Sequence, residues 1–161
     1  MTAGPRRLLT VCLGNHCRSP LAAVVLTELG GPAVEVRSAG TRDKWVGHPA
    51  HREMVSAGTR DKWVGHPAHR EMVTAAAARG YDLTAHRGVH ISRDLLEWAD
   101  TILAMDTGNL TALRTLVDER TAPKLGLYLI DRDVPDPWGK GQEAFAAVVT
   151  LVEDGAARHL P

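Results

Sequence analysis

The sequence predicts a three-layer α/β/α fold, with a central parallel sheet of four strands covered by helices on both faces. Short apolar runs alternate with helical patterns along the chain, which is typical of a parallel sheet. A chain of 161 residues, 44% of them hydrophobic, suffices for one domain with its own core. We therefore expect one domain over residues 1–161, with any ligand beyond the carboxyl ends of the strands.

The first elements are a strand, a helix and a second strand. "RLLTVC" (7–12) is a short apolar run typical of a buried strand. Residues 19–29 fit a helix with Ser19 as its N-cap and Pro20 at its first helical position, and two glycines follow its end. "AVEVRS" (33–38) is predicted as the second strand.

The rest of the chain continues the alternation. Gly80 ends an Ala-rich helical segment, and Ser92 is a candidate N-cap for the helix that follows. The remaining predicted helices are 71–79, 92–99, 109–117 and 142–160, and the remaining strands are 101–105 and 124–130.

Composition excludes several classes of protein. Basic and acidic residues balance at 19 each, so nothing indicates binding to nucleic acid or to an anionic membrane. The sequence shows neither a secretory leader nor an apolar run near the ~18 residues of a spanning helix. Two cysteines are too few for a secreted disulfide framework. We expect a cytoplasmic protein without nucleic-acid or membrane partners.

An internal repeat interrupts the pattern. "SAGTRDKWVGHPAHREMV" occurs at 38–55 and again at 56–73 without a mismatch. Solenoids need at least three repeats, so two perfect copies indicate a tandem duplication. The first copy continues a strand and the second runs into a helix, which leaves one copy surplus. Doubling a loop costs only about 0.6 kcal/mol in closure entropy, and we expect an enlarged loop near 45–65.

Both cysteines lie in "VCLGNHCRSP" (11–20), between the first strand and the first helix. A loop here can turn its backbone N–H groups toward one point and form an anion site at a helix N-terminus. Gly14 and Asn15 tolerate the left-handed backbone that such a loop needs, and Arg18 offers two parallel donors to a phosphate. The positive potential favours the thiolate of Cys12, a nucleophile placed below the phosphorus. The predicted phosphate-binding residues are Leu13, Gly14, Asn15, His16, Cys17, Arg18 and Ser19.

Other readings of this loop fail on its residues. No Walker motif is present in the chain. A zinc site is not expected, because the two cysteines lack a partner pair and Arg18 would repel a cation. The duplicated "HPAH" histidines are interpreted as polar residues at a helix start. We expect neither a metal nor another cofactor.

A candidate general acid follows the last predicted strand. Asp136 lies between Pro135 and Pro137, which restrict its backbone. A leaving phenolate or alkoxide needs a proton, which is worth typically 10²–10⁴-fold in rate. Asp131 and Asp133 are competitors without that constraint.

These motifs together resemble the low-molecular-weight protein tyrosine phosphatases. The similarity rests on "VCLGNHCRSP" and on "DVPDPWG" (133–139), with weaker echoes at "VRSAGT" (36–41), "GYDLTAHR" (80–87) and "ILAMDTGNL" (102–110). It runs over nearly the whole chain apart from the surplus copy. The resemblance implies the same four-stranded fold and a metal-free phosphatase of phosphotyrosine in proteins.

The resemblance also implies a role for several residues. Cys12 is the nucleophile that becomes phosphorylated, and Arg18 clamps the phosphoryl oxygens. Ser19 donates to the Cys12 thiolate. Asp136 protonates the leaving oxygen and later activates water.

Three further residues have supporting roles by the same resemblance. Asn15 holds the loop and is steadied by His86. Cys17 can close a reversible disulfide with Cys12 that protects against oxidation.

Some positions depart from the family pattern. The family usually carries an aliphatic residue where this chain has His16, and members dedicated to phosphoarginine carry Thr there. Trp138 is a candidate wall of the substrate cleft. The enlarged loop supplies Trp45 and Trp63, of which one takes the remaining aromatic position near the entrance.

Other functions stay open from the sequence. An arsenate reductase of the same fold is one, in a form coupled to small thiols, because no cysteine follows Cys17. A phosphoarginine phosphatase and a non-catalytic phosphate-binding module are the others. The expected partner is a phosphotyrosine-containing protein, and the expected state is a monomer or weak dimer.

Deletion of residues 56–73 tests the interpretation of the repeat. The shortened chain is expected to fold, because the strand before the repeat and the helix after it are kept. Circular dichroism and a denaturation curve against the full chain measure this. A shortened chain that fails to fold would show that the second copy belongs to the core.

Overall fold

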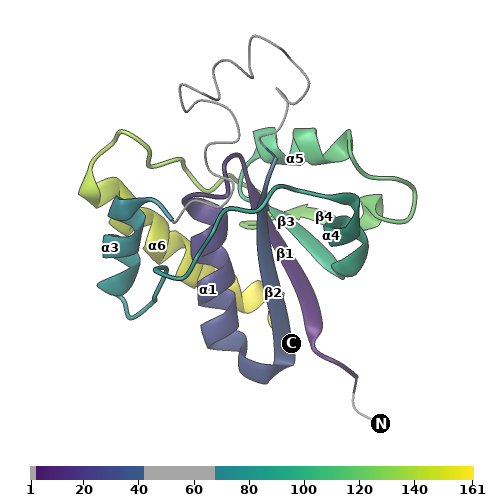
Figure 1. Cartoon of the computed structure of the whole chain (residues 1–161), viewed down its shortest axis with the longest axis horizontal. Coiled ribbons are helices and arrows are strands. Elements are labelled where there is room, and N and C mark those ends of the chain that lie inside the picture. Colours follow the sequence, from purple (N-terminus) through teal and green to yellow (C-terminus); the bar gives the residue numbers. More distant parts are fainter. Residues whose placement is uncertain (1–2, 42–67) are drawn as a thin grey trace.

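A four-stranded parallel sheet forms the centre of the computed structural model, which describes residues 3–41 and 68–161 (Figure 1). The strand order is β2-β1-β3-β4. The strands are β1 (Arg6–Cys12), β2 (Val34–Gly40), β3 (Thr101–Ala104) and β4 (Leu125–Leu127). This confirms the predicted fold class. The loop expected near 45–65, with Trp45 and Trp63, lies outside the described residues.

Helices cover both faces of the sheet. Figure 1 shows α1, α3 and α6 on one side and α4 and α5 on the other. The α-helices are α1 (Arg18–Gly30), α3 (Arg70–Ala77), α4 (Arg93–Trp98), α5 (Thr107–Arg114) and α6 (Gln142–Ala156). Short 3-10 helices are η1 (Gly31–Ala33), η2 (Ala122–Lys124) and η3 (Ala157–His159).

Two apolar clusters fix these layers. One packs α1, α3 and α6 against the sheet and contains Leu8, Leu21, Met72 and Phe145. The other packs α4 and α5 against the opposite face around Leu9. Leu8 and Leu9 are both fully buried and belong to different clusters, because successive side chains of a strand point to opposite faces. A continuous apolar strand therefore serves both layers.

Local hydrogen bonds shift some helix boundaries. The cap predicted at Ser19 is wrong, since Cys17 is the N-cap and α1 begins at Arg18. Ser19 turns its hydroxyl to the Cys12 sulfur instead. The α5 helix begins at Thr107 rather than 109, because the carboxylate of Asp106 accepts the backbone N–H of Asn109 and caps it.

The last strand and the last helix are shorter than predicted. The strand expected over 124–130 is reduced to three residues, and Ile130 has a positive φ of 72° directly after it. The helix expected over 142–160 ends at Ala156 and continues as η3. There the buried His159 ring donates from Nε2 to the Tyr128 carbonyl at 2.7 Å, and the resulting burial lowers the pKa of His159. This contact anchors the end of the chain on the segment after β4.

The order of the strands indicates where in the sheet a ligand site is expected. β1 pairs with β2 on one side and with β3 on the other. The chain crosses over at β1, and such a switch point is where parallel sheets hold their ligands. In the part of the chain that the structure describes, no helix is long and apolar enough to cross a membrane.

Candidate active site

The loop after β1 places Cys12 at the floor of a bowl. Cys12 is the last residue of the strand and is buried, and its Sγ lies 3.0 Å from Ser19 Oγ. Ser19 is fully buried and also receives a hydrogen bond from Asn15 Nδ2 at 2.9 Å. Because that amide donates to the Ser19 oxygen, the hydroxyl proton is available to the Cys12 sulfur.

Asn15 holds the shape of this loop. It has a φ of 51°, in the left-handed region that was predicted, whereas Gly14 does not adopt a positive φ. Its side chain is 1% exposed and joins Ser19 to Ser38 through Nδ2, at 2.9 Å each. Its Oδ1 accepts the backbone N–H of Val89 at 2.7 Å. Both polar atoms of the Asn15 side chain, Nδ2 and Oδ1, are therefore hydrogen-bonded, and these bonds hold its own left-handed backbone in place.

His86 fixes the Asn15 backbone from outside the loop. Its Nε2 lies 2.7 Å from the Asn15 carbonyl oxygen. A carbonyl only accepts, so Nε2 carries the proton. Burial lowers the pKa of His86, against the raising effect of this hydrogen bond. The contact predicted between His86 and Asn15 is present.

Arg18 is held in place by two partners that are distant in the sequence, one at the start of α5 and one in the loop after β4. Its Nη1 donates to Asp106 Oδ2 and to the Val134 carbonyl oxygen, both at 2.8 Å. Only 5% of Arg18 is exposed. Burial works against its charge, but Cys12 and Asp106 together raise the pKa of the guanidinium. A buried cation fixed at one nitrogen keeps its other donors for an anion.

Cys17 differs from Cys12 in its environment. Both thiols are free and buried. Burial, with the nearby Cys12, raises the pKa of Cys17 far above its usual range. Cys17 is therefore a neutral thiol beside the floor of the bowl.

A second loop, 131–138, packs across the bowl from the end of β4. The backbone N–H of Val134 donates to the Met105 carbonyl at 2.7 Å. Asp133 Oδ1 accepts from both the backbone N–H and the hydroxyl of Thr107, at 2.9 and 2.7 Å. Asp133 is thus occupied as an anchor of this loop.

Asp136 is an exposed carboxyl further along that loop. Its Oδ1 accepts the backbone N–H of Trp138 at 3.0 Å. Its negative charge acts on the pKa of Cys17 and of Arg18, and on that of His69. The structure therefore brings Asp136 to the cysteine loop, as the sequence predicted.

Aromatic rings line one side of the mouth. Trp138, 51% exposed, meets the edge of the His69 ring with centroids 4.7 Å apart. His69 lies 5.2 Å from His16 and stacks on Phe145 at 4.9 Å. The backbone N–H of His69 donates to the His16 carbonyl at 2.7 Å. We name His16, His69 and Trp138 the aromatic wall.

The sequence analysis selected candidate reacting groups but missed several residues that hydrogen-bond to them or pack beside them. Asp106, Ser38, Thr107 and His69 were not selected as site residues. Of these four residues, only Asp106 could have been predicted from the sequence, because it is a polar residue directly after a predicted buried strand. Among residues 3–41 and 68–161, no cluster of three or more metal-ligating side chains occurs.

The family model described as low molecular weight phosphotyrosine protein phosphatase matches residues 7–56 and 50–160. The chain belongs to this family. It is therefore a protein-tyrosine phosphatase by family, a hydrolase of phosphomonoesters. The two matched segments overlap inside the repeated stretch.

Individual relatives of this phosphatase cover most of its length. It is 31% identical over 152 residues to the low molecular weight protein-tyrosine-phosphatase Wzb of Salmonella typhi, covering 93% of this chain and 89% of the relative. It is 30% identical over 148 residues to a protein-arginine-phosphatase of Geobacillus stearothermophilus, covering 89% and 86%. The structure of Vibrio vulnificus Wzb with benzylphosphonate matches with a TM-score of 0.77 and 28% identity, covering 97% of each chain.

Gly40 provides a test of the bowl. A Cβ at this residue would lie 2.8 Å from the Asn15 nitrogen and 2.9 Å from the Leu13 carbonyl oxygen. Backbone atoms cannot yield as a flexible side chain would, so Gly40→Ala is expected to displace the loop. We expect a loss of about 1–3 kcal/mol in unfolding free energy and a fall in aryl phosphate hydrolysis of 10-fold or more.

The matched control is Gly126→Ala in β4, where a Cβ meets nothing within 4 Å. Denaturant titration and steady-state kinetics measure both variants. If Gly40→Ala hydrolysed aryl phosphate as fast as Gly126→Ala, the prediction would be wrong. The cysteine loop would then tolerate a displacement of the end of β2.

Proposed function

We propose that this phosphatase hydrolyses phosphotyrosine in proteins with Cys12 as nucleophile, Arg18 as phosphate clamp and Asp136 as general acid. The observation that carries the assignment is the convergence of these three groups from the ends of β1 and β4. Ser19 at 3.0 Å supports the sulfur, and Asp106 at 2.8 Å supports the guanidinium.

The first step transfers the phosphoryl group to sulfur. The Cys12 thiolate attacks phosphorus, a P–S bond forms and the bond from phosphorus to the tyrosine oxygen breaks. Asp136 gives its proton to that oxygen, so that tyrosine leaves neutral. The free donors of Arg18 and the N–H groups of residues 13–18 balance the charge on the phosphoryl oxygens.

The second step releases inorganic phosphate. Asp136, now a carboxylate, takes a proton from water as the water oxygen attacks phosphorus. The P–S bond breaks and its electron pair returns to Cys12, where the Ser19 hydroxyl stabilises the thiolate. No step of this sequence uses a metal or a redox cofactor.

The aromatic wall supports a tyrosine substrate. An exposed indole edge beside two imidazoles offers stacking surface to a phenyl ring. The Wzb of Vibrio vulnificus was solved with benzylphosphonate, which joins an aromatic ring to a phosphonate group. By this argument phosphotyrosine is preferred to phosphoarginine, and His16 and Trp138 are the residues that contact the ring.

The domain organisation, location and oligomeric state are proposed together with this function. We take residues 1–161 as one phosphatase domain in which the second copy of the repeat enlarges a loop. The protein acts in the cytoplasm as a monomer or weak dimer, with phosphotyrosine side chains of other proteins as its substrates.

Cys12→Ser tests covalent catalysis. Turnover of phosphotyrosine is expected to fall by about 10⁴-fold or more, because an alcohol at this position is far less ionised than a thiol. Orthophosphate binding, followed by calorimetry, should persist and serves as the control for an intact bowl. Hydrolysis well above background in a variant that still binds phosphate would contradict the cysteinyl-phosphate intermediate.

Asp136→Ala tests the acid. We expect hydrolysis of phenyl phosphate, which has a poor leaving group, to fall by about 10²–10³-fold. Hydrolysis of 2,4-dinitrophenyl phosphate, whose leaving group needs no proton, should fall far less. Rates on the two substrates, measured for each variant, give this ratio.

Two other aspartates of the same loop, Asp131 and Asp133, serve as control positions for Asp136→Ala. Asp133→Ala removes the anchor to Thr107 and should slow both substrates alike. Asp131→Ala, on the exposed start of the same loop, should leave both rates near the parent. If Asp136→Ala slowed the hydrolysis of both substrates equally, another group would be the general acid.

A further inference from the structure

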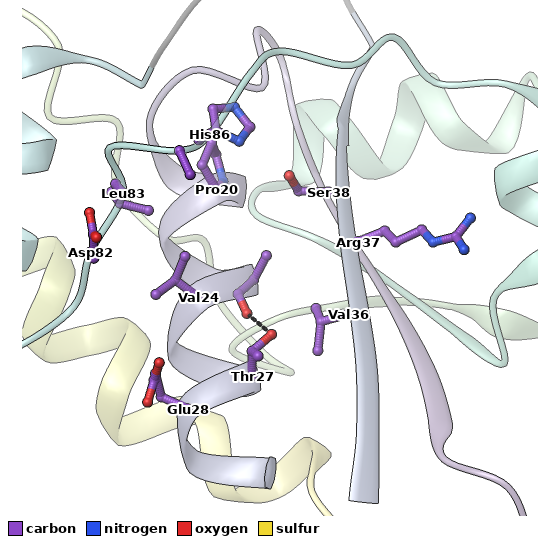
Figure 2. A pocket seen from close by; sticks show the side chains of 12 residues that line it. Pro20, Val24, Thr27, Glu28, Val36, Arg37, Ser38, Asp82, Leu83 and His86 are labelled. Atoms are coloured by element: carbon purple, nitrogen blue, oxygen red, sulfur yellow. Dashed lines mark hydrogen bonds between the residues drawn. The ribbon is translucent and has the colours of Figure 1, made fainter. Parts of the chain in front are cut away.

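An open groove lies beside α1, lined by residues of α1, β2 and the segment 82–86. Figure 2 shows it between α1 and β2, closed at one side by residues 82–86. Its volume is about 380 Å³, within the range of small-ligand sites. Cys12, Arg18 and Asp136 do not line it.

The floor of the groove is apolar and uncovered. Val24 of α1 and Val36 of β2 line it and are only half-buried, and the buried Leu83 lines it from the segment 82–86 (Figure 2). The Thr27 hydroxyl donates to the Ala23 carbonyl at 2.7 Å, so its proton needs no acceptor from a ligand. This floor fits the hydrocarbon body of a ligand.

The rim of the groove carries negative charge. Glu28 and Asp82 are both exposed and lie at the same edge in Figure 2. Hydrogen bonds from the Thr84 hydroxyl and N–H lower the pKa of Asp82, so it is ionised at neutral pH. A cation above this edge would face two carboxylates.

The positive groups nearby are turned to other partners. Arg37 extends away from the groove, with its guanidinium 4.2 Å above the Trp98 ring and paired with Glu35 at 3.2 Å. Arg87 donates to the carbonyls of Thr84 and His86 on its own turn. Neither offers a counter-charge to an anion in the groove.

From this combination we propose that the groove binds an organic cation, an ammonium group joined to an apolar body. The hydrocarbon part lies on Val24, Val36 and Leu83, and the ammonium group lies between Glu28 and Asp82. The ligand is small, because the space would not hold a folded partner.

The upper end of the groove reaches the phosphate loop. Ser38 and His86 both line it, and both hydrogen-bond to Asn15, at 2.9 and 2.7 Å. A ligand that contacts these two side chains shares neighbours with the residue that shapes the loop. Binding of the cation and binding of phosphate are therefore coupled, and each changes the affinity of the other by the same factor.

Titration of the full ¹⁵N-labelled chain with 2-phenylethylammonium tests the site. Amide shifts should change saturably at Val24, Val36 and Leu83. The neutral analogue 2-phenylethanol should bind at least about 5-fold more weakly. Equal binding of both would overturn the assignment to a cation, and shifts confined to the cysteine loop, or none, would overturn the site.

Matched variants locate the ligand. Val24→Phe fills the groove and should weaken binding at least 10-fold, whereas Leu29→Phe, on the same helix outside it, should not. Glu28→Gln and Asp82→Asn should each weaken binding about 2- to 5-fold, the range of a surface ion pair. Glu119→Gln removes a distant charge as the control. Unchanged binding in Val24→Phe would overturn the proposal.

Coupling is measured by repeating the titration with saturating orthophosphate. We expect the dissociation constant of the amine to change several-fold. An unchanged constant would overturn the link to Asn15. Hydrolysis is not needed for either titration, so these results stand apart from the test of the catalytic mechanism.

Discussion

The left-handed backbone at Asn15 is the constraint on which the rest of the site depends. A non-glycine residue holds that conformation only when its surroundings outweigh the strain. Here the side-chain amide bonds to Ser19, Ser38 and the Val89 backbone, while His86 holds the carbonyl. If these bonds were lost, they would no longer offset the strain at Asn15, and we expect the loop to relax.

A second set of contacts ties this loop to the other strand ends. Arg18 joins the cysteine loop to Asp106 after β3 and to Val134 after β4. Val134 is itself bonded to Met105, and Asp133 holds Thr107. The segments that carry Cys12, Arg18 and Asp136 thus follow two strands, β1 and β4, and Arg18 links these segments by hydrogen bonds. Preorganised groups of this kind need little rearrangement during reaction, which is the main source of electrostatic catalysis.

The same network extends to both sides of the loop. On the reactive side, His69 and Trp138 form an aromatic wall against Phe145. On the opposite side, Ser38 and His86 border the groove between α1 and β2. The residues that shape the phosphate loop are thus in contact with surface that never meets the phosphate.

The sequence alone predicted the order of strands and helices along the chain, and it selected Cys12, Arg18 and Asp136 as candidate reacting groups. Apolar periodicity is local, and Cys12 and Arg18 are separated by five residues, so short-range patterns sufficed. Proline on both sides of Asp136 singled it out from two other carboxyls in the same way. Only the tertiary structure decided what holds these groups. Arg18 and Asp106 are 88 positions apart, and Asn15 and His86 are 71 apart. The packing of parallel strands brings such residues together, and no spacing along the chain records it.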